Sequence, residues 1–275
     1  MRIGVIGTGN IGSMLAGALV RSKAARPKAI SVFNRTESKA RELAARYPGL
    51  RVCASAEQAV RRSDTVFLCV KPLQLFPLLQ SLNGFWHPEQ LAVSVTSPVR
   101  IDQLEKIIPC HTARAVPSIV NQTLAGNTLV TFGTTLTDFQ KYKLWHLLGN
   151  FSHPIEIDEA YIRIASDLSS CGPAFLSFFL EKMILDATRV TQISRKTATE
   201  LATQMTIGFG KLLEEETYTL PKLREKVTVK GGVTGAGLSV LDKEYGALFE
   251  HLFEATQKKF VEDHQAIDPS FDRID

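Results

Sequence analysis

The sequence predicts an α/β domain followed by an all-helical domain. Up to about residue 158, short apolar segments alternate with segments whose apolar residues recur at helical spacing. Alternation of this kind is typical of βαβ units and a parallel sheet. From residue 159 onward, long helical patterns follow one another with no convincing strand between them. Because a chain of 275 residues suits two domains, we expect them to span residues 1–158 and 159–275.

The first half contains seven short apolar segments that we expect to be strands of this sheet. Thr65–Val70 is a continuous run of mainly β-branched and aromatic residues, which indicates a strand buried on both faces. Thr36 is a good N-cap for a helix from Lys39 to Tyr47, and another helix is expected over Thr137–Leu148. The other expected strands are Arg2–Ile6, Ala29–Phe33, Leu91–Val95, Ala113–Val116, Leu129–Phe132 and Phe151–Ile157.

The second half is expected to form three long helices and a polar tail. The middle helix carries an apolar face that needs a partner surface, formed by Leu201, Met205, Phe209 and Leu212. The tail, Asp263–Asp275, is polar and contains Pro269, so we expect it to be loosely held. The three expected helices are Phe175–Val190, Arg195–Glu215 and Ser239–Asp263.

Composition limits the classes of partner and the location. A net charge of +4 is mild and diffuse, with no run of Lys and Arg collected on one stretch, so we expect no nucleic-acid partner. The longest apolar runs are strand-sized, so we expect no membrane partner. The N-terminus enters a strand directly, without a basic and apolar leader, which favours a cytoplasmic location. The four cysteines lack C-x-x-C or zinc spacing, so we expect buried small hydrophobes and no metal site.

A glycine-rich segment lies between the first expected strand and the first helix. Gly7-Thr8-Gly9-Asn10-Ile11-Gly12 fits G-x-G-x-x-G, the turn that binds dinucleotide phosphates. Gly7 allows the tight turn, Gly9 lets the backbone approach the pyrophosphate, and Gly12 lets helix and strand pack closely. The sequence therefore predicts a Rossmann dinucleotide-binding domain, with the phosphates at the start of the helix.

The end of the second expected strand selects between the two nicotinamide cofactors. An NAD-selective site has Asp or Glu there, but this chain has Asn34-Arg35-Thr36, with Lys39 one turn further on. Because Arg35 offers a 2′-phosphate a bidentate charged partner, we expect NADP(H). The alternative is that Arg35 is a solvated residue at a helix start. Val70-Lys71-Pro72 lies at the end of the expected strand Thr65–Val70. We expect the backbone of this segment to line the nicotinamide site.

These three segments together resemble the pyrroline-5-carboxylate reductases, and the resemblance covers nearly the whole chain. Downstream, Arg114-Ala115-Val116-Pro117 is similar to the family's R-x-M-P, and Ser170–Ala174 to its S-G-x-G-P-A. Val227–Leu238 is similar to V-T-S-P-G-G-T-T-x-x-G-L. The chain looks most like the late-competence ComER-type branch of Bacillus-like bacteria, on Thr96–Val99, Val116–Ile119, Ser170–Phe175 and Lys230–Gly235. The resemblance adds Thr96 and Ser118 to the expected cofactor-binding residues.

The resemblance implies hydride transfer from the nicotinamide to the C=N bond of 1-pyrroline-5-carboxylate, giving proline. It implies a substrate turn of Lys230, Gly231, Gly232, Val233 and Thr234, in which backbone N–H groups hold the carboxylate. Thr234 would be the catalytic hydroxyl at the imine nitrogen, unless it is an ordinary helix N-cap. Val229, Lys230 and Val233 replace the family's serine, proline and first threonine. Glu216 matches a family glutamate that faces the substrate nitrogen only if one residue is inserted.

Three functions remain open at this point. The first is a pyrroline-5-carboxylate reductase with a modified pocket, and the second is an NADP-dependent reductase of another small cyclic imine or carbonyl compound. The third is a dinucleotide-binding regulatory protein with little turnover. The resemblance also implies a homodimer with interleaved helices, and it leaves open a larger ring of dimers.

Overall fold

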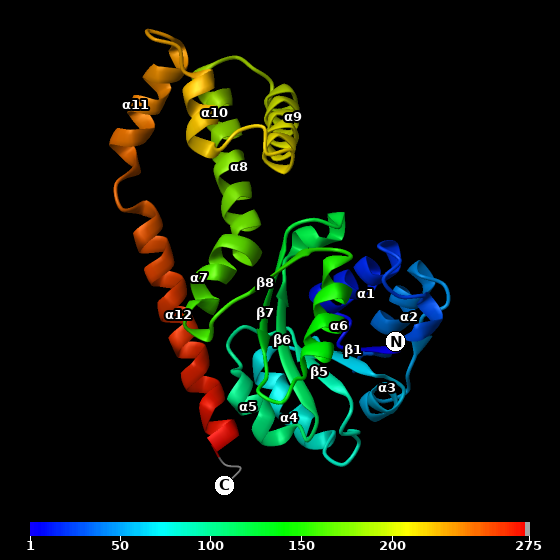
Figure 1. Ribbon diagram of the computed structural model, residues 1–275. Coiled ribbons are helices and arrows are strands. Elements are labelled where there is room, and N and C mark those ends of the chain that lie inside the picture. The colour runs from blue at the N-terminus through cyan, green and yellow to red at the C-terminus, as the bar shows by residue number, and fades with distance from the viewer. Residues whose placement is uncertain (273–275) are drawn as a thin grey trace. The chain divides into compact units, whose positions relative to one another are not determined.

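The computed structural model describes residues 1–272, and their contacts divide the chain into two compact units (Figure 1). Unit 1 consists of Met1–Pro173 together with Phe253–Asp275, and unit 2 of Ala174–Leu252. Each unit is described by itself below.

Unit 1 is built on one eight-stranded sheet in the order β3-β2-β1-β4-β5-β6-β7-β8. All neighbouring strands are parallel except β6 and β7, so the expected α/β Rossmann fold is confirmed. The two-residue strand β3 is too short to leave a sequence pattern and was not expected. The strands are β1 (Ile3–Ile6), β2 (Ile30–Phe33), β3 (Arg51–Val52), β4 (Thr65–Leu68), β5 (Leu91–Ser94), β6 (His111–Pro117), β7 (Asn127–Phe132) and β8 (His153–Glu156).

The antiparallel strand β7 departs from the wholly parallel sheet that the sequence indicated. Between β6 and β7 lies only the short helix η2 (Ile119–Thr123), followed by Leu124 and Gly126 with φ of 61° and 76°. A parallel crossover needs a connection of a dozen residues or more, usually a helix. The short connection therefore turns the chain straight back, and β7 runs against β6.

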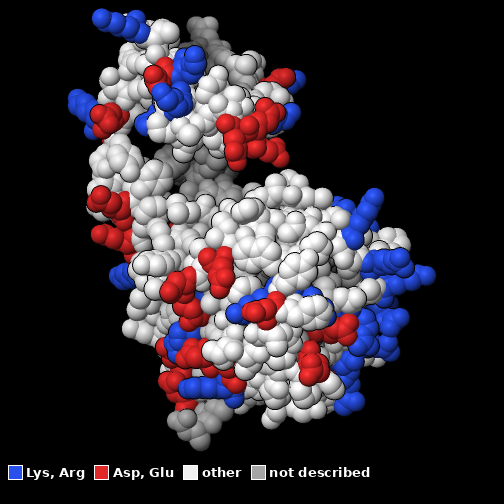
Figure 2. Space-filling view, viewed as in Figure 1, with Lys and Arg blue, Asp and Glu red and all other residues white. Residues whose placement is uncertain are grey.

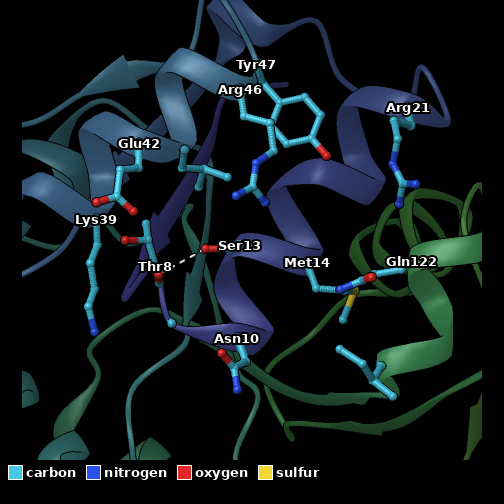
Figure 3. Close-up of a pocket in the computed structure, with 13 residues that line it drawn as sticks. Thr8, Asn10, Ser13, Met14, Arg21, Lys39, Glu42, Arg46, Tyr47 and Gln122 are labelled. Carbon is cyan, nitrogen blue, oxygen red and sulfur yellow. Dashed lines mark hydrogen bonds between the residues drawn. The ribbon is translucent and has the colours of Figure 1, made fainter.

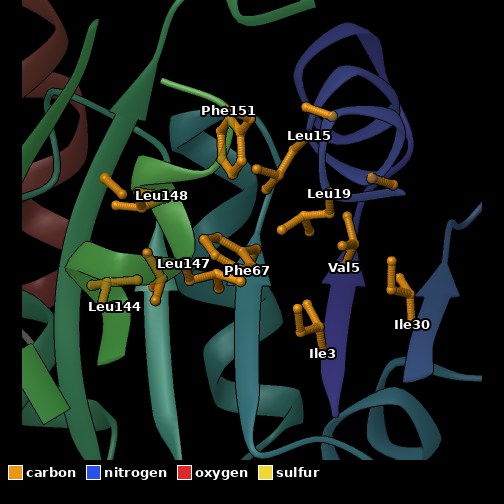
Figure 4. Close-up of a cluster of buried hydrophobic side chains, with 14 of the residues drawn as sticks. Ile3, Val5, Leu15, Leu19, Ile30, Phe67, Leu144, Leu147, Leu148 and Phe151 are labelled. Atoms are coloured by element: carbon orange, nitrogen blue, oxygen red, sulfur yellow. The ribbon is translucent and has the colours of Figure 1, made fainter. Parts of the chain in front are cut away.

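Helices cover both faces of the sheet. On one face α1 (Asn10–Arg21), α2 (Glu37–Arg46) and α6 (Asp138–Gly149) pack on β-strand residues such as Val5 and Phe67 (Figure 4). On the other face lie α3 (Ala56–Arg61), α4 (Pro72–Ser81) and α5 (Ile101–Ile107). A sheet covered on both faces needs apolar side chains on both sides of each strand, which explains the continuous apolar runs. The short helix η1 (Pro27–Ala29) precedes β2.

The end of the C-terminal helix is part of the unit 1 core. Helix α12 runs from Leu248 to Phe271, and the side chains of Ile267 and Phe271 are 2% and 1% exposed among the residues of α3, α4 and α5. The ring of Phe271 meets that of Phe76 edge to face at 5.1 Å. The expectation of a loosely held tail is therefore wrong for residues 263–271, because two apolar side chains four residues apart fall on the buried face of a helix.

The stretch Glu159–Val190 is continuous helical structure. It comprises η3 (Glu159–Tyr161), α7 (Ile162–Ser166), the π-helical turn η4 (Asp167–Cys171) and α8 (Gly172–Val190). By length and composition this stretch could cross a membrane, and the apolar window within it has no buried residues. The expectation that no segment is long enough was therefore wrong, because the polar residues Ser169 and Ser170 do not interrupt the helix.

Unit 2 consists of helices that bury very little. Besides most of α8 and the start of α12, it contains α9 (Arg195–Glu214), α10 (Leu220–Val227) and α11 (Val233–Tyr245). Of its described residues, Ala198 and Ala202 alone are buried. The expected single helix Ser239–Asp263 is wrong, because the chain breaks at Gly246, whose φ is 48°, between α11 and α12.

Candidate functional site

The glycine-rich loop has the geometry that its three glycines predict. Gly7 has φ of +96°, and its N–H donates to the carbonyl of Phe33 at 2.8 Å. A Cβ at Gly12 would lie 1.8 Å from the carbonyl oxygen of Gly7, so this helix residue must be glycine for the loop to close. A Cβ at Gly9 would meet nothing within 4 Å. Gly7 and Gly12 are therefore required by the fold itself, whereas Gly9 leaves space for a ligand.

Thr8 carries an unsatisfied polar group into this space. The residue is 4% exposed, and its Oγ1 has no hydrogen-bond partner among the described residues. Its carbonyl accepts from Ser13 Oγ at 2.9 Å (Figure 3), and its N–H donates to Asn34 Oδ1 at 2.9 Å. A buried hydroxyl without a partner is costly, so it is expected where a ligand supplies the partner. The glycine-rich loop thus has both the open space at Gly9 and the unpaired hydroxyl of Thr8 that a dinucleotide phosphate would need.

Asn34 connects the glycine-rich loop to the segment after β2, the two places where the sequence predicts the cofactor phosphates. Its amide accepts from Thr8 N–H and donates to the Thr36 carbonyl at 2.9 Å. Sequence analysis chose Asn34 for its position after the second strand, but the bond to Thr8 joins residues 26 apart and required the fold. Arg35, Thr36 and Lys39 are all exposed. With no acid at the end of β2, this segment leaves a 2′-phosphate free of repulsion.

One cavity of ≈ 520 Å³ extends from this loop along the groove between α1 and α2 (Figure 3). Of the expected cofactor residues, Thr8, Gly9, Asn10 and Lys39 line it, whereas Arg35 does not. Arg35 forms no ion pair with any described residue and is exposed, so its side chain is free to reach a phosphate. Six further residues with polar groups line this cavity, and no sequence motif gives a signal for them: Ser13, Arg21, Glu42, Arg46, Tyr47 and Gln122.

The remaining expected cofactor residues differ in what they can offer. Lys71 is the N-cap of α4 and Pro72 its first residue, and Cys69 and Val70 connect them to the carboxyl end of β4. Thr96 is 6% exposed, and its Oγ1 is bonded to Ser94 Oγ at 2.9 Å. Ser118 is fully buried, and its Oγ donates to the Ser169 carbonyl at 2.9 Å. Both hydroxyls therefore have internal partners.

Arg114, the arginine of the segment that resembles R-x-M-P, has a structural role. This arginine of β6 is 1% exposed, and its guanidinium donates to the carbonyls of Ser97 and Val99 at 3.2 and 3.1 Å. It also pairs with Glu159 at 3.1 Å. Burial lowers the pKa of the Arg114 guanidinium, while the Glu159 carboxylate opposes that shift. Arg114 thus fixes the loop after β5, at the carboxyl ends of the strands where the ligand crevice of this fold lies.

The expected substrate turn lies in unit 2, ahead of α11. Gly231 has φ of +74°, and the N–H of Gly232 donates to the Val229 carbonyl at 2.9 Å. Gly232 is the N-cap of α11, so Thr234 is its second residue and the N-cap alternative for Thr234 is wrong. The first N–H groups of a helix have no partner within it, so those of Val233 and Thr234 are available to an anion.

Glu216 lies near this turn. It follows α9 with φ of 50°, a left-handed conformation uncommon for glutamate. A cavity of ≈ 720 Å³ in unit 2 is lined by Glu216 together with Thr228 and Val229. Thr228 Oγ1 is buried and has no partner among the described residues, which sequence analysis did not predict. The fold thus brings Glu216 and the start of the substrate turn to one cavity.

Comparison with known proteins matches both parts of the chain. Residues 2–98 match the family model "NADP oxidoreductase coenzyme F420-dependent", and residues 159–263 match "Pyrroline-5-carboxylate reductase dimerisation". ComE operon protein 4 of Bacillus subtilis is 43% identical, covering 98% of this chain and 99% of that protein. Pyrroline-5-carboxylate reductase 3 of the same organism is 28% identical, covering 94% and 95%.

Solved structures share the fold over almost the full length. The pyrroline-5-carboxylate reductase of Coxiella burnetii has a TM-score of 0.83 at 24% identity, covering 97% of this chain and 98% of its own. The Plasmodium falciparum pyrroline carboxylate reductase, solved with NADP bound, has a TM-score of 0.81 at 20% identity, with the same coverage.

These matches make the chain an NADP(H)-binding oxidoreductase with a Rossmann domain, as the glycine-rich loop and the absence of an acid after β2 also indicate. Within that class it belongs to the pyrroline-5-carboxylate reductase family, and its similarity to ComE operon protein 4 confirms the late-competence branch that the motifs indicated.

Proposed function

We propose that the chain is an NADPH-dependent reductase of the C=N bond of a small cyclic imine that carries a carboxylate. The first candidate substrate is 1-pyrroline-5-carboxylate, the reduction of which gives proline. The reduced nicotinamide supplies the hydride. The observation that carries the proposal is the turn Val229–Thr234, which keeps an anion-binding backbone but has lost two hydroxyl-bearing positions.

The turn is suited to hold the substrate carboxylate. Left-handed Gly231 precedes the N-terminus of the 13-residue helix α11, where free N–H groups and the helix dipole favour an anion. Lys230 adds a cation beside this backbone, where the family has an uncharged proline. A carboxylate should therefore bind to this turn at least as well as in typical family members.

The reacting end of the substrate has fewer partners. Val229 and Val233 stand in place of a serine and a threonine, and their side chains are 66% and 90% exposed. Thr234 and Glu216 are the remaining groups that we assign to the imine nitrogen. Lost donors at the reacting atoms lower the rate more than they lower binding. We therefore expect weak turnover of 1-pyrroline-5-carboxylate with retained binding of proline or a carboxylate analogue.

Restoring the family residues tests this proposal. The triple variant Val229→Ser, Lys230→Pro, Val233→Thr should raise kcat by one to two orders of magnitude, about 1.4–2.7 kcal/mol of barrier. The control is Val240→Thr, which adds a hydroxyl to α11 at a side chain that is 60% exposed and outside the turn. Steady-state NADPH oxidation with 1-pyrroline-5-carboxylate measures both. The expectation of weak turnover fails if the unmodified chain already turns over at the rate of typical family members. The role assigned to the turn fails if the triple variant behaves like the control.

A dinucleotide-binding protein with little turnover is the second candidate function. The same exposed valines favour it, because they remove hydroxyl donors that reduction of the imine uses. NADPH binding without oxidation on a panel of cyclic imines and carbonyl compounds would support this candidate. Oxidation of NADPH in the presence of another imine or a carbonyl compound would instead identify a reductase that acts on a different substrate.

The working form that we propose is a homodimer assembled through unit 2. The match to the dimerisation model covers residues 159–263, and of the described residues of unit 2 only two are buried. A larger ring of dimers and a cytoplasmic location stay predictions, as does the absence of a membrane partner. The apolar stretch Glu159–Val190 is explained by this assembly, because its exposed Leu176, Phe178 and Met183 need a covering surface.

A further inference from the structure

The positive charge of the chain is concentrated on one part of unit 1. Residues 21–62 hold eleven Lys and Arg but only three Glu, a net charge of +8, whereas the whole chain carries +4. All eleven side chains are exposed. Figure 2 shows Lys and Arg gathered at the margin of unit 1 where Figure 1 places α2 and α3. The expectation of a diffuse charge was therefore wrong, because these cations are interspersed with other residues and form an excess over the whole segment without forming a run.

Most of these cations lie at the amino ends of the strands. Lys28 is in η1, immediately before β2, and Arg51 is the first residue of the edge strand β3. Arg62 follows α3 ahead of β4, and Arg46 is the last residue of α2. In a parallel α/β sheet the ligand crevice lies at the opposite, carboxyl ends. The cofactor phosphates therefore do not account for these charges, apart from that of Arg46, which lines the cofactor cavity. We call five other residues the basic edge: Lys23, Arg26, Lys28, Arg51 and Arg62.

The cations of the basic edge are not neutralised by the chain itself. None of the five forms an ion pair with a carboxylate among the described residues, whereas nearby Arg2 and Arg41 pair with Asp64 and Glu37. Arg51 in β3 and Arg62 after α3 both act on the Cys53 thiol. Burial raises the pKa of this thiol, and a hydrogen bond with Ser31 and the charges of Arg62 and Arg51 oppose that rise.

Favourable helix dipoles explain only part of this arrangement. Arg21, Arg46 and Arg61 each end a helix, where a cation stabilises the C-terminus. Arg21 also donates to the Gly17 carbonyl, and Arg61 lies over the Phe85 ring. Lys28, in η1, and Arg51, in a strand, have no such role. An unpaired surface of one sign attracts a partner of the opposite sign.

We propose that the basic edge binds the phosphate backbone of double-stranded nucleic acid, independently of base sequence. Eight of the eleven cations in residues 21–62 are arginines, whose guanidinium groups match phosphate oxygens in bidentate geometry. Between Met1 and Leu73 the described residues include no exposed large hydrophobic side chain. An anionic membrane surface is bound with apolar or aromatic anchors, and single strands with aromatic stacking platforms. The basic edge has neither, so backbone contact with a duplex fits it best.

Fluorescence anisotropy with labelled duplexes of unrelated sequence tests the proposal. The unmodified chain should bind all of them within a few-fold of one another, and the affinity should fall steeply between about 50 and 200 mM salt. The variant Lys28→Gln, Arg51→Gln, Arg62→Gln should bind at least tenfold more weakly. The slope of the logarithm of its binding constant against the logarithm of the salt concentration should be smaller by about one for each phosphate contact removed. NADPH binding should be unchanged, since these residues lie away from the glycine-rich loop.

The charge-matched control is Lys106→Gln, Lys143→Gln, Lys258→Gln, which removes three exposed cations of unit 1 outside the basic edge. It should retain duplex binding. The proposal is overturned if the control weakens binding as much as the edge variant, or if saturating NADPH displaces the duplex. It is also overturned if vesicles containing anionic lipid bind through the edge residues and duplexes do not.

Discussion

The glycines of the loop after β1 serve two different purposes, and substitution can separate them. A Cβ at Gly12 would collide with the Gly7 carbonyl at 1.8 Å, whereas a Cβ at Gly9 would meet no atom within 4 Å. Gly12→Ala should therefore lower the melting temperature of the chain without cofactor. Gly9→Ala should leave that temperature within about 2 °C, since surface substitutions change stability by about 0.5 kcal/mol or less.

The cofactor distinguishes the two variants. Gly9→Ala should lose at least tenfold in NADPH affinity, because its methyl group occupies the space where the backbone approaches the pyrophosphate. Thermal unfolding and NADPH fluorescence titration measure both effects. Unchanged NADPH affinity in Gly9→Ala would contradict the assignment of this space to the cofactor.

Arg35 is expected to select NADP(H). Its exposed guanidinium follows β2 where an NAD-selective chain has an acid, so Arg35→Asp should reverse or abolish a preference for NADPH of at least several-fold. Arg41→Asp is the control, because it makes the same charge change in α2 at a residue paired with Glu37. The ratio of kcat/KM, or of the dissociation constants for the two cofactors, is the measurement. Equal affinity for NADH and NADPH in the unmodified chain would refute the assignment.

His264 should make the stability of unit 1 depend on pH. Burial lowers the pKa of this imidazole from 6.5, with Arg100 and Arg114 adding to the shift and Asp268 and Glu159 opposing it. The folded chain thus binds this proton less readily than the unfolded chain, and stability is lost as pH falls below about 6.5. The melting temperature should drop between pH 7.5 and 5.5, and by less in His264→Gln. Equal drops in both proteins would exclude His264 as the cause.

At the scale of elements, the C-terminal turns of α12 behave as core. Phe271→Ala removes a ring that is 1% exposed and packed on Phe76, so it should cost about 3–5 kcal/mol of unfolding free energy. Val261→Ala, on the same helix at a side chain that is 44% exposed, should cost about 0.5 kcal/mol or less. Urea unfolding followed by circular dichroism compares the two. Similar costs would mean that the end of α12 is not docked in solution.

At the scale of the whole molecule, the exposed apolar side chains of unit 2 predict that a second chain covers them. The helices of unit 2 bury only Ala198 and Ala202 among the described residues, while side chains such as Leu201 and Met205 are 60% and 51% exposed. A domain stabilised by burial cannot persist with so small a core. We expect an obligate homodimer at micromolar concentration, measured by light scattering coupled to gel filtration. Leu201→Lys should dissociate or unfold it, whereas Lys211→Ala on the same helix should not. A stable folded monomer would contradict the prediction.

Local features of the sequence determined much of unit 1. The G-x-G-x-x-G segment, the residues Asn34-Arg35-Thr36 and the buried strand beginning at Thr65 each act through neighbours in the chain, so their spacing alone identified fold and cofactor. Seven of the eight strands and α6 were predicted to within a few residues for the same reason, and only the two-residue strand β3 was not expected.

Only the tertiary structure decided the features that depend on residues distant in sequence. The direction of β7 and the docking of Phe271 depend on which segments meet in space. The orphaned hydroxyl of Thr8 and the internal partner of Ser118 are likewise set by the fold. The excess of cations in residues 21–62 can be counted in the sequence, although acids elsewhere reduce the net charge to +4. The fold alone decides that most of these cations lie at the amino ends of the strands, away from the ligand crevice. Periodicity records local contacts, whereas burial and charge density arise when distant segments pack together.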